Sequence, residues 1–330
     1  MRKIKILILT LCVLLAVASL ASCKGKGEGE KPEKQYFTVT FDSNGGSEVQ
    51  SLKIAEGGSV TKPQDPQREN YVFDHWTYNS KEWSFETDTV KSDITLVAKW
   101  IEATEIYSCE PISATENKIT EVKKKLDNMV IPEIIGGKSI VAIGDGAFED
   151  TSSENTKSIV LPEKLTSVGK AAFKNCAGVE ITVKGQLTEI GEQAFLGCDG
   201  LKSVNLGEGL TSIPFEAFRN CSSLSELIFP SSLLSVDENA FENCSALKAI
   251  IMHTSVATIG NSAFDGASEL EVIYLYGKKA DIGNISIAEN NDEFYNAINN
   301  KSYIYAKDKP TNSGDYWYFN EKGKIRIWDK

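Results

Sequence analysis

Four cysteines recur at nearly constant spacing, and a thiol can form a disulfide, bind a metal ion or act as a nucleophile. They are separated by 22, 23 and 23 residues: Cys176, Cys198, Cys221 and Cys244. Each stands three residues after a phenylalanine, and the next such slot holds Ala267. A slot that accepts Cys or Ala favours a small, buried, apolar side chain. Disulfides between adjacent slots and a metal site remain as alternatives, although the spacing differs from that of C-x2-C zinc sites.

Histidine, the commonest acid–base group and metal ligand, is scarce in this chain. Only His75 and His253 are present, and they lie far apart in the sequence. The motifs H-E-x-x-H, G-x-S-x-G and G-x-G-x-x-G and the phosphate-binding loop are missing from the sequence. We therefore expect a protein that is not an enzyme and that needs no metal or cofactor.

The N-terminus carries one cysteine with a different expected role. Arg2, Lys3 and Lys5 precede an apolar run and small residues, which is the pattern of a secretory signal peptide. The stretch Leu20-Ala21-Ser22-Cys23 resembles the bacterial lipobox, which implies cleavage after residue 22 and lipid on the Cys23 thiol. The alternative is an ordinary secreted protein with a chance cysteine at the cleavage site. We expect the acyl chains to be the only contact with the membrane.

A phrase that ends in Ala-Phe recurs six times and must position the four spaced cysteines. Its first copy is Ile143-Gly144-Asp145-Gly146-Ala147-Phe148. The closing phenylalanines are separated by 25, 22, 23, 23 and 23 residues: Phe148, Phe173, Phe195, Phe218, Phe241 and Phe264. A fixed period of this length is typical of a solenoid, in which stacked units share one long hydrophobic core. We expect the phenylalanines to lie in register, one above another.

Each Cys slot is followed by an L-x-x-I-x-L phrase, for example Leu224 to Phe229. Alternation places its large apolar residues inward and the intervening ones outward, as in a strand. Each coil should carry this strand, a turn, a second short extended stretch and a short helical turn with the Ala-Phe pair. The pattern I-G-x-x-A-F-x-x-C-x-x-L-x-x-I-x-L resembles the BspA-type leucine-rich repeat, which implies a mainly β solenoid. Residues 179–183 depart from the phrase, so we expect a local irregularity there.

Two segments precede the solenoid. Residues 23–35 are charged and Gly-rich, which predicts a lipid-anchored flexible tether. Residues 36–101 contain alternating strand patterns and the turn signal Asn44-Gly45. They resemble the internalin-type B-repeat, which implies a small β-grasp-like domain of bacterial surface proteins. Its three tryptophans, Trp76, Trp83 and Trp100, should be core residues, with a ligand platform as the alternative.

The solenoid itself is expected over residues 102–275, with its N-terminal end capped by the segment before the first repeat. Lys123, Lys124 and Lys125 form a basic cluster there, which we interpret as a solvated strand edge or turn. Residues 276–330 break the period and are rich in aromatic residues. We predict that they cap the last coil, because an uncapped core layer would face water. Display of aromatic rings for carbohydrate stacking is the alternative.

The strand position between the last two inward residues should form a row on the surface of the stacked coils. Its members are Val160, Thr182, Asn205, Ile228, Ile251 and Tyr274. Several of them are large and apolar, and an exposed apolar stripe is a candidate contact surface. The alternative is that these residues serve strand propensity alone.

Charge narrows the range of partners. The formal net charge is −11, which disfavours binding to nucleic acid or to an anionic membrane surface. We expect a non-catalytic lipoprotein of the bacterial cell envelope, exposed on the surface, that binds a host or neighbouring-cell protein or glycan. The alternative is a structural or scaffold lipoprotein of the envelope without an external ligand.

Overall fold

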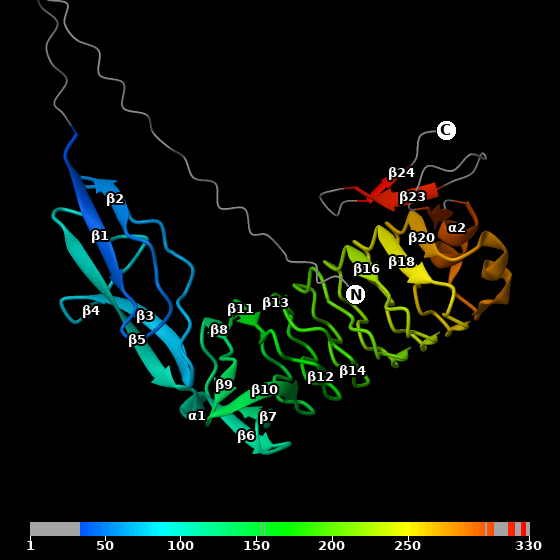
Figure 1. Ribbon diagram of the computed structural model, residues 1–330, viewed down its shortest axis with the longest axis horizontal. Coiled ribbons are helices and arrows are strands. Elements are labelled where there is room, and N and C mark those ends of the chain that lie inside the picture. The colour runs from blue at the N-terminus through cyan, green and yellow to red at the C-terminus, as the bar shows by residue number, and fades with distance from the viewer. Residues whose placement is uncertain are drawn as a thin grey trace, which may run out of the picture.

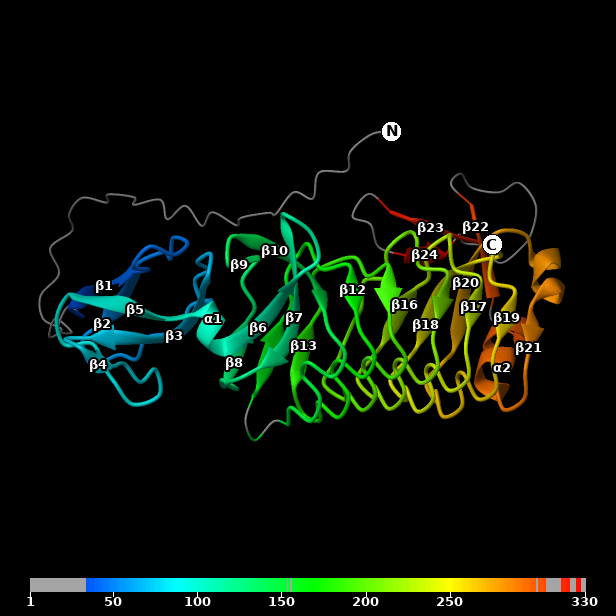
Figure 2. The same cartoon turned by 90° about the horizontal axis from the view of Figure 1, so that it is seen from below.

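The computed structural model describes residues 34–152, 154, 156–300, 302–306, 316–320 and 325–327. The predicted signal peptide (1–22), the lipid site Cys23 and most of the tether lie outside these residues. Figure 1 shows a small β module followed by a long solenoid, and the two meet at an angle. Figure 2 shows the successive coils of the solenoid side by side.

The N-terminal module is one five-stranded sheet in the order β2-β1-β5-β3-β4. Its strands are β1 (Tyr36–Asp42), β2 (Leu52–Ala55), β3 (Tyr71–Tyr78), β4 (Lys81–Glu82) and β5 (Ile94–Glu102). The central pair β1 and β5 is parallel, and each central strand has an antiparallel neighbour outside it, which is a β-grasp-like arrangement. Trp76 and Trp83 are buried in the module core, while Trp100 packs against it and is partly exposed.

Asn70 joins the module to the solenoid. Its backbone adopts φ 66°. Its N–H donates to the Ile134 carbonyl (2.9 Å), and its carbonyl accepts from the Ala103 N–H (2.8 Å). Its side-chain oxygen accepts from the Gly137 N–H (3.3 Å). Val72 of the module packs in the solenoid core, so hydrogen bonds and apolar burial both fix the joint.

The N-terminal end of the solenoid is covered by a short helix and five strands. These are α1 (Ala103–Ile106), β6 (Tyr107–Pro111), β7 (Glu116–Val122), β8 (Asn128–Val130), β9 (Ile134–Ile135) and β10 (Lys138–Ile143). Tyr107 is fully buried, with its ring 6.4 Å from that of Phe148, and burial raises the pKa of its hydroxyl. Lys123, Lys124 and Lys125 are exposed directly after β7, and the first two form a bend, in agreement with the prediction.

Two parallel ladders run along the solenoid. The first, which we call the outer ladder, contains β8, β11 (Ser158–Val160), β13 (Glu180–Thr182), β16 (Glu226–Ile228), β18 (Ala249–His253) and β20 (Val272–Tyr276). The second ladder contains β10, β12 (Ser167–Val168), β14 (Glu189–Ile190), β15 (Ser212–Ile213), β17 (Ser235–Val236), β19 (Thr258–Ile259) and β21 (Ser286–Ile287). Each coil contributes one short strand to each ladder, apart from an interruption described below.

The repeat phenylalanines form one continuous stack, which confirms the expected register. The centroids of Phe173, Phe195, Phe218 and Phe241 are 5.2 to 5.3 Å from their neighbours, with nearly parallel planes. Phe148 and Phe264 extend the stack at its two ends. All six rings are buried. The Ala-Phe pairs lie in consecutive i→i−3 turns, with left-handed residues such as Gly146 and Ala171 just before them.

The cysteine slots form a second buried column beside the phenylalanines. Cys176, Cys198, Cys221 and Cys244 are free thiols, and all four are buried, as is Ala267. Each thiol donates to the carbonyl of a phenylalanine in the preceding coil, at 3.0 to 3.2 Å. This confirms the prediction of a small buried slot.

Both ladders are interrupted at the same coil. Residues 201–206 form no strand. Leu206 forms an isolated bridge with Leu187, and the Lys202 carbonyl accepts from the Ser225 N–H of the next coil at 3.4 Å. Ile181 lies five residues after its cysteine, whereas Val204 lies six after Cys198, because the preceding repeat is one residue short. The turns that carry the Ala-Phe pairs nevertheless stay aligned, and the rings of Phe195 and Phe218 are 5.3 Å apart. The strands before and after this coil are not paired with each other. The irregularity expected at 179–183 is found on one side of β13. This strand is paired with β11 but has no paired strand in the next coil.

A helix closes the C-terminal end of the core, which the sequence interpretation did not include. After the 3-10 helix η1 (Lys279–Asn284) comes α2 (Asp292–Asn300). Phe294 of α2 stacks on Phe264 at 4.8 Å and continues the phenylalanine column, and Ala297 and Ile298 are buried beside it. The aromatic-rich strands β22 (Ser302–Tyr305), β23 (Tyr316–Phe319) and β24 (Ile325–Ile327) extend the outer ladder instead.

Candidate functional site

The outward side chains of the outer ladder, which we call the outer face, contain the row predicted from the sequence. Strand register aligns Val130, Val160 and Thr182 in its first part. Beyond the interruption it aligns Ile228, Ile251, Tyr274 and Tyr303. Asn205 is exposed between the two parts but belongs to no strand. The inward neighbours, such as Ile159 and Leu227, are buried, so the predicted alternation is present.

The row is less exposed than expected at its C-terminal end. Ile228 is 57% exposed, but Ile251 is only 5% exposed, so the expectation that Ile251 faces solvent is wrong. Tyr274 is half-buried, as is Val160 at the other end. The reason is that the C-terminal strands lie over the last coils (Figure 1). Trp317 is fully buried, with its ring 5.4 Å from Tyr274 and 5.0 Å from Tyr276.

The segment predicted to cap the last coil does so in two ways: α2 covers the phenylalanine column, and the aromatic strand β22 pairs with β20 of the last coil. Tyr276 stacks on His253 (4.6 Å), and its ring is tilted against that of Tyr305 (4.7 Å). Trp317 packs on this cluster. Burial lowers the pKa of His253, with Glu208 opposing this shift. Burial, followed by the nearby Tyr303 and Glu226, raises the pKa of Tyr274. The strands that carry these aromatic rings form a raised border at one end of the outer face.

The module forms the border at the opposite end. Its loop around Pro63 and Gln64 faces Val160, Thr182 and Lys184 across a groove of about 380 Å³. The loop contains Pro63 and Pro66, and no pattern in its sequence indicates that it approaches the solenoid. The outer face is thus bounded on both sides, and its middle, around Asn205 and Ile228, is open (Figure 1).

Charged pairs cross between coils on this side of the molecule. Lys202 pairs with Glu180 at 2.6 Å, and Lys157 pairs with Asp127 at 3.0 Å. All four side chains are well exposed, so each pair contributes about 0–1 kcal/mol. Mixed charge with an exposed apolar centre suits contact with another molecule better than it suits catalysis.

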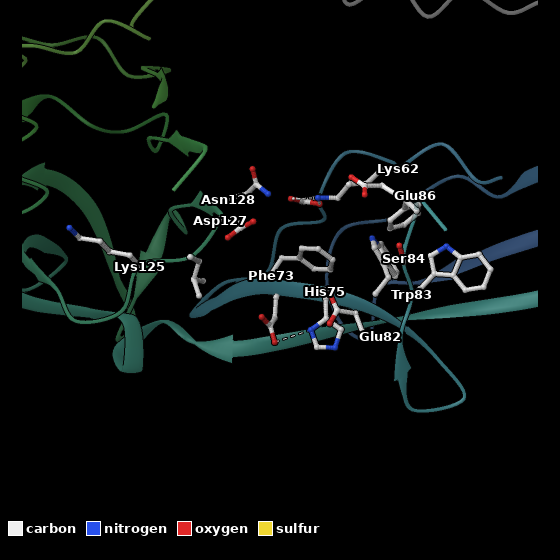
Figure 3. Close-up of a pocket in the computed structure, with 15 residues that line it drawn as sticks. Lys62, Phe73, His75, Glu82, Trp83, Ser84, Glu86, Lys125, Asp127 and Asn128 are labelled. Atoms are coloured by element: carbon white, nitrogen blue, oxygen red, sulfur yellow. Dashed lines mark hydrogen bonds and ion pairs between the residues drawn. The ribbon is translucent and has the colours of Figure 1, made fainter. Parts of the chain in front are cut away.

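A larger cleft of about 820 Å³ lies between the module and the first coils (Figure 3). His75 lies there, with Nδ1 3.0 Å from a carboxylate oxygen of Asp74. The other histidine, His253, is at the far end of the solenoid, so the structure does not bring the two together. Within the described ranges, no group of three His, Cys, Asp or Glu side chains could hold a metal ion. In that same part of the chain, no helix is long and apolar enough for a membrane span.

Comparison with known families gives two matches. The model described as the BspA type leucine rich repeat region matches residues 122–214 and 188–308, in six copies. The model of the Listeria-Bacteroides repeat domain matches residues 37–99. The second match covers most of the N-terminal module, and the first covers most of the solenoid.

Two proteins of Evansella cellulosilytica are similar to parts of this chain. One, named as a Gly-rich membrane protein, is 35% identical over 103 residues, which is 30% of this chain and 12% of that protein. The other, named as a membrane protein, is 41% identical over 73 residues, or 21% of this chain and 11% of that protein. The chain therefore matches only about a tenth of the length of these relatives.

Solved structures with similar chains are bacterial leucine-rich repeat proteins. The T. pallidum leucine-rich repeat protein has a TM-score of 0.46 at 20% identity, covering 61% of this chain and 84% of that one. A leucine-rich cell surface protein of Faecalibacterium prausnitzii has a TM-score of 0.39 at 18% identity, covering 68% of this chain and 60% of that one.

Proposed function

The chain belongs to the BspA-type leucine-rich repeat family, and from that premise we propose that it is a non-catalytic lipoprotein of the bacterial cell surface. Lipid on Cys23 holds it at the membrane, and the tether and the module raise the solenoid above it. The outer face binds a protein or glycan of a host or neighbouring cell. The Evansella proteins named as membrane proteins support a location at the envelope.

One observation carries the choice of surface. Ile228 is 57% exposed in the open middle of the outer face, beside the exposed Glu226 and Asn205. A large apolar side chain held on a rigid strand and surrounded by polar groups is typical of the centre of a contact surface. The phenylalanine column fixes the strands that present it, so the surface is formed before any partner arrives.

The test begins with the purified full chain and a panel of extracellular-matrix proteins and glycans. Replacing Ile228 by Asp places a charge at the centre of the contact, and we expect it to weaken binding at least tenfold. Leu234→Asp is the matched control, because Leu234 is 52% exposed but directly precedes β17 of the second ladder. Both variants should keep the stability of the parent chain within about 0.5 kcal/mol, because both sites are on the surface.

Equal loss of binding in both variants, or none in either, would exclude the outer face. Protease treatment of intact cells tests the alternative, which is a scaffold lipoprotein of the envelope without an external ligand. A surface protein is cleaved, whereas an internal envelope component stays protected. Radiolabelled palmitate incorporated into the parent chain and lost in Cys23→Ala checks the anchor separately.

A further inference from the structure

The strand β8 ends the outer ladder at the cleft between module and solenoid. It is the terminal strand of the sheet β13-β11-β8, so only one of its edges is paired. Towards β11, the Asp127 carbonyl accepts from the Lys157 N–H at 2.6 Å, and the Ile131 N–H donates to the Val160 carbonyl at 3.0 Å. Alternation along a parallel ladder then turns the N–H and C=O groups of Asn128 and Val130 to the opposite side.

That opposite side is where the cavities of this region lie. Asn128 lines both the 820 Å³ cleft and the 380 Å³ groove, and Val130 lines the groove and a further cavity of about 220 Å³. The module contacts β8 through β3, but the two strands are not paired, and β11 is the strand hydrogen-bonded to β8. Figure 3 shows Asp127 and Asn128 on one wall of the cleft, Glu86 and Ser84 on the other, and the Phe73 ring between them. An unpaired strand edge beside a cavity is the arrangement that accepts an added strand.

The charge of the cleft indicates which strand would fit. Its lining includes five carboxylates, Asp65, Asp74, Glu82, Glu86 and Asp127, against Lys62 and Lys125. Three of these carboxylates already have partners. Asp65 pairs with Lys62 at 3.1 Å, Asp127 pairs with Lys157 at 3.0 Å, and Asp74 lies 3.0 Å from Nδ1 of His75. Lys125 donates to the Asp150 carbonyl and points away from the cleft in Figure 3. Glu82 and Glu86 are both exposed, and neither side chain forms a hydrogen bond or an ion pair with another described residue.

We propose that the cleft and the adjoining groove form a second binding site, which takes an extended basic peptide segment of a partner protein as an added strand on the free edge of β8. Backbone groups of the peptide pair with Asn128 and Val130. Its basic side chains meet Glu82 and Glu86, and its apolar side chains pack on Val130 and Phe73. This site is separate from the open middle of the outer face and does not depend on the function proposed for it.

The test uses the purified full chain and three synthetic eight-residue peptides. The first alternates lysine and valine, the second alternates glutamate and valine, and the third repeats the first with N-methylated backbone on alternate residues. We expect the lysine peptide to bind at least tenfold more tightly than either of the others. Amide hydrogen exchange at Asn128 and Val130 should slow when it binds. Equal affinity of the methylated peptide would overturn strand addition, because methylation removes the backbone donors.

Variants locate the site. Glu82→Gln combined with Glu86→Gln should weaken the lysine peptide at least fivefold, whereas Glu269→Gln, an exposed glutamate of a later coil, should leave it unchanged. All three changes are on exposed side chains, so the chain should fold as before. Binding of the neutral sugar chitotriose in place of the peptide, or no peptide binding at all, would refute the proposal. Ile228→Asp should not alter peptide binding, which separates this result from the test of the outer face.

Discussion

At the scale of single residues, each coil contributes one phenylalanine and one small side chain to two buried columns. Three thiols of the cysteine column, Cys198, Cys221 and Cys244, are chemically quiet, because burial keeps them protonated. Burial raises the pKa of Cys244 from 9.0 to about 12, and it also raises the pKa values of Cys198 and Cys221. Ala267 in the same slot shows that the position needs small volume and not a thiol. The cysteines therefore belong to the core.

The raised thiol pKa values predict alkaline destabilisation. A buried thiol stays protonated in the folded state up to its raised pKa, whereas in the unfolded state it ionises near 9.0. The unfolded state then binds fewer protons, so stability is fully present below pH 9 and is lost as the pH rises towards 12. Each thiol can remove up to about 1.4 kcal/mol per pH unit in that window.

Urea unfolding of the parent chain and of Cys244→Ala at pH 8, 9.5 and 10.5 measures this effect. Other groups, such as lysines, titrate equally in both proteins, so the difference between the two curves isolates one thiol. The parent should lose about 2 kcal/mol more than the variant between pH 8 and pH 10.5. Parallel pH profiles would mean that Cys244 is not buried as a protonated thiol.

At the scale of elements, the coils depend on what covers the two ends of the phenylalanine column. Tyr107 closes one end and Phe294 of α2 closes the other. In a solenoid each unit is stabilised by its neighbours, so an end ring protects the coil beneath it. The aromatic strands β22 and β23 instead cover part of the outer face, where Trp317 is buried.

Removal of the end ring should therefore destabilise the chain strongly. Phe294→Ala deletes a fully buried ring, and we expect a cost of about 3–5 kcal/mol. Tyr295→Ala is the control, because this neighbour on the same helix is 56% exposed, and it should cost no more than about 0.5 kcal/mol. Chemical denaturation followed by circular dichroism measures both. Similar costs in the two variants would show that α2 does not close the core.

Sequence periodicity predicted the elements that repeat and missed those that occur once. The alignment of Phe173 with Phe195 could be predicted, because both close the same Ala-Phe phrase in successive coils. In α2, Phe294, Ala297 and Ile298 have helical spacing, and this signal could have predicted the helix. Alternation predicted that Ile251 points outward, which the register supports. The burial of Ile251 depends on the C-terminal strands, which lie more than fifty residues further along the chain. A local sequence pattern cannot predict such a contact.

At the scale of the whole molecule, the module and the solenoid act as one body with an open face between two raised ends. Asn70 and the shared core around Val72 hold the module at its angle, and the C-terminal strands hold the other border. The joint could not be predicted from sequence, because Asn70 reads as an ordinary turn residue. Its three hydrogen bonds reach partners 33 to 67 positions along the chain. The outer face therefore has a fixed shape, set by the whole chain.

Amide hydrogen exchange of the full chain, with and without the matrix protein or glycan that it binds most tightly, tests the central claim most directly. The claim is that contact occurs on the outer face. It predicts slowed exchange at residues 158–160, 180–182 and 226–228, with unchanged exchange at residues 167–168, 212–213 and 235–236 of the second ladder. Slowed exchange in the second ladder, with the outer strands unchanged, would contradict it.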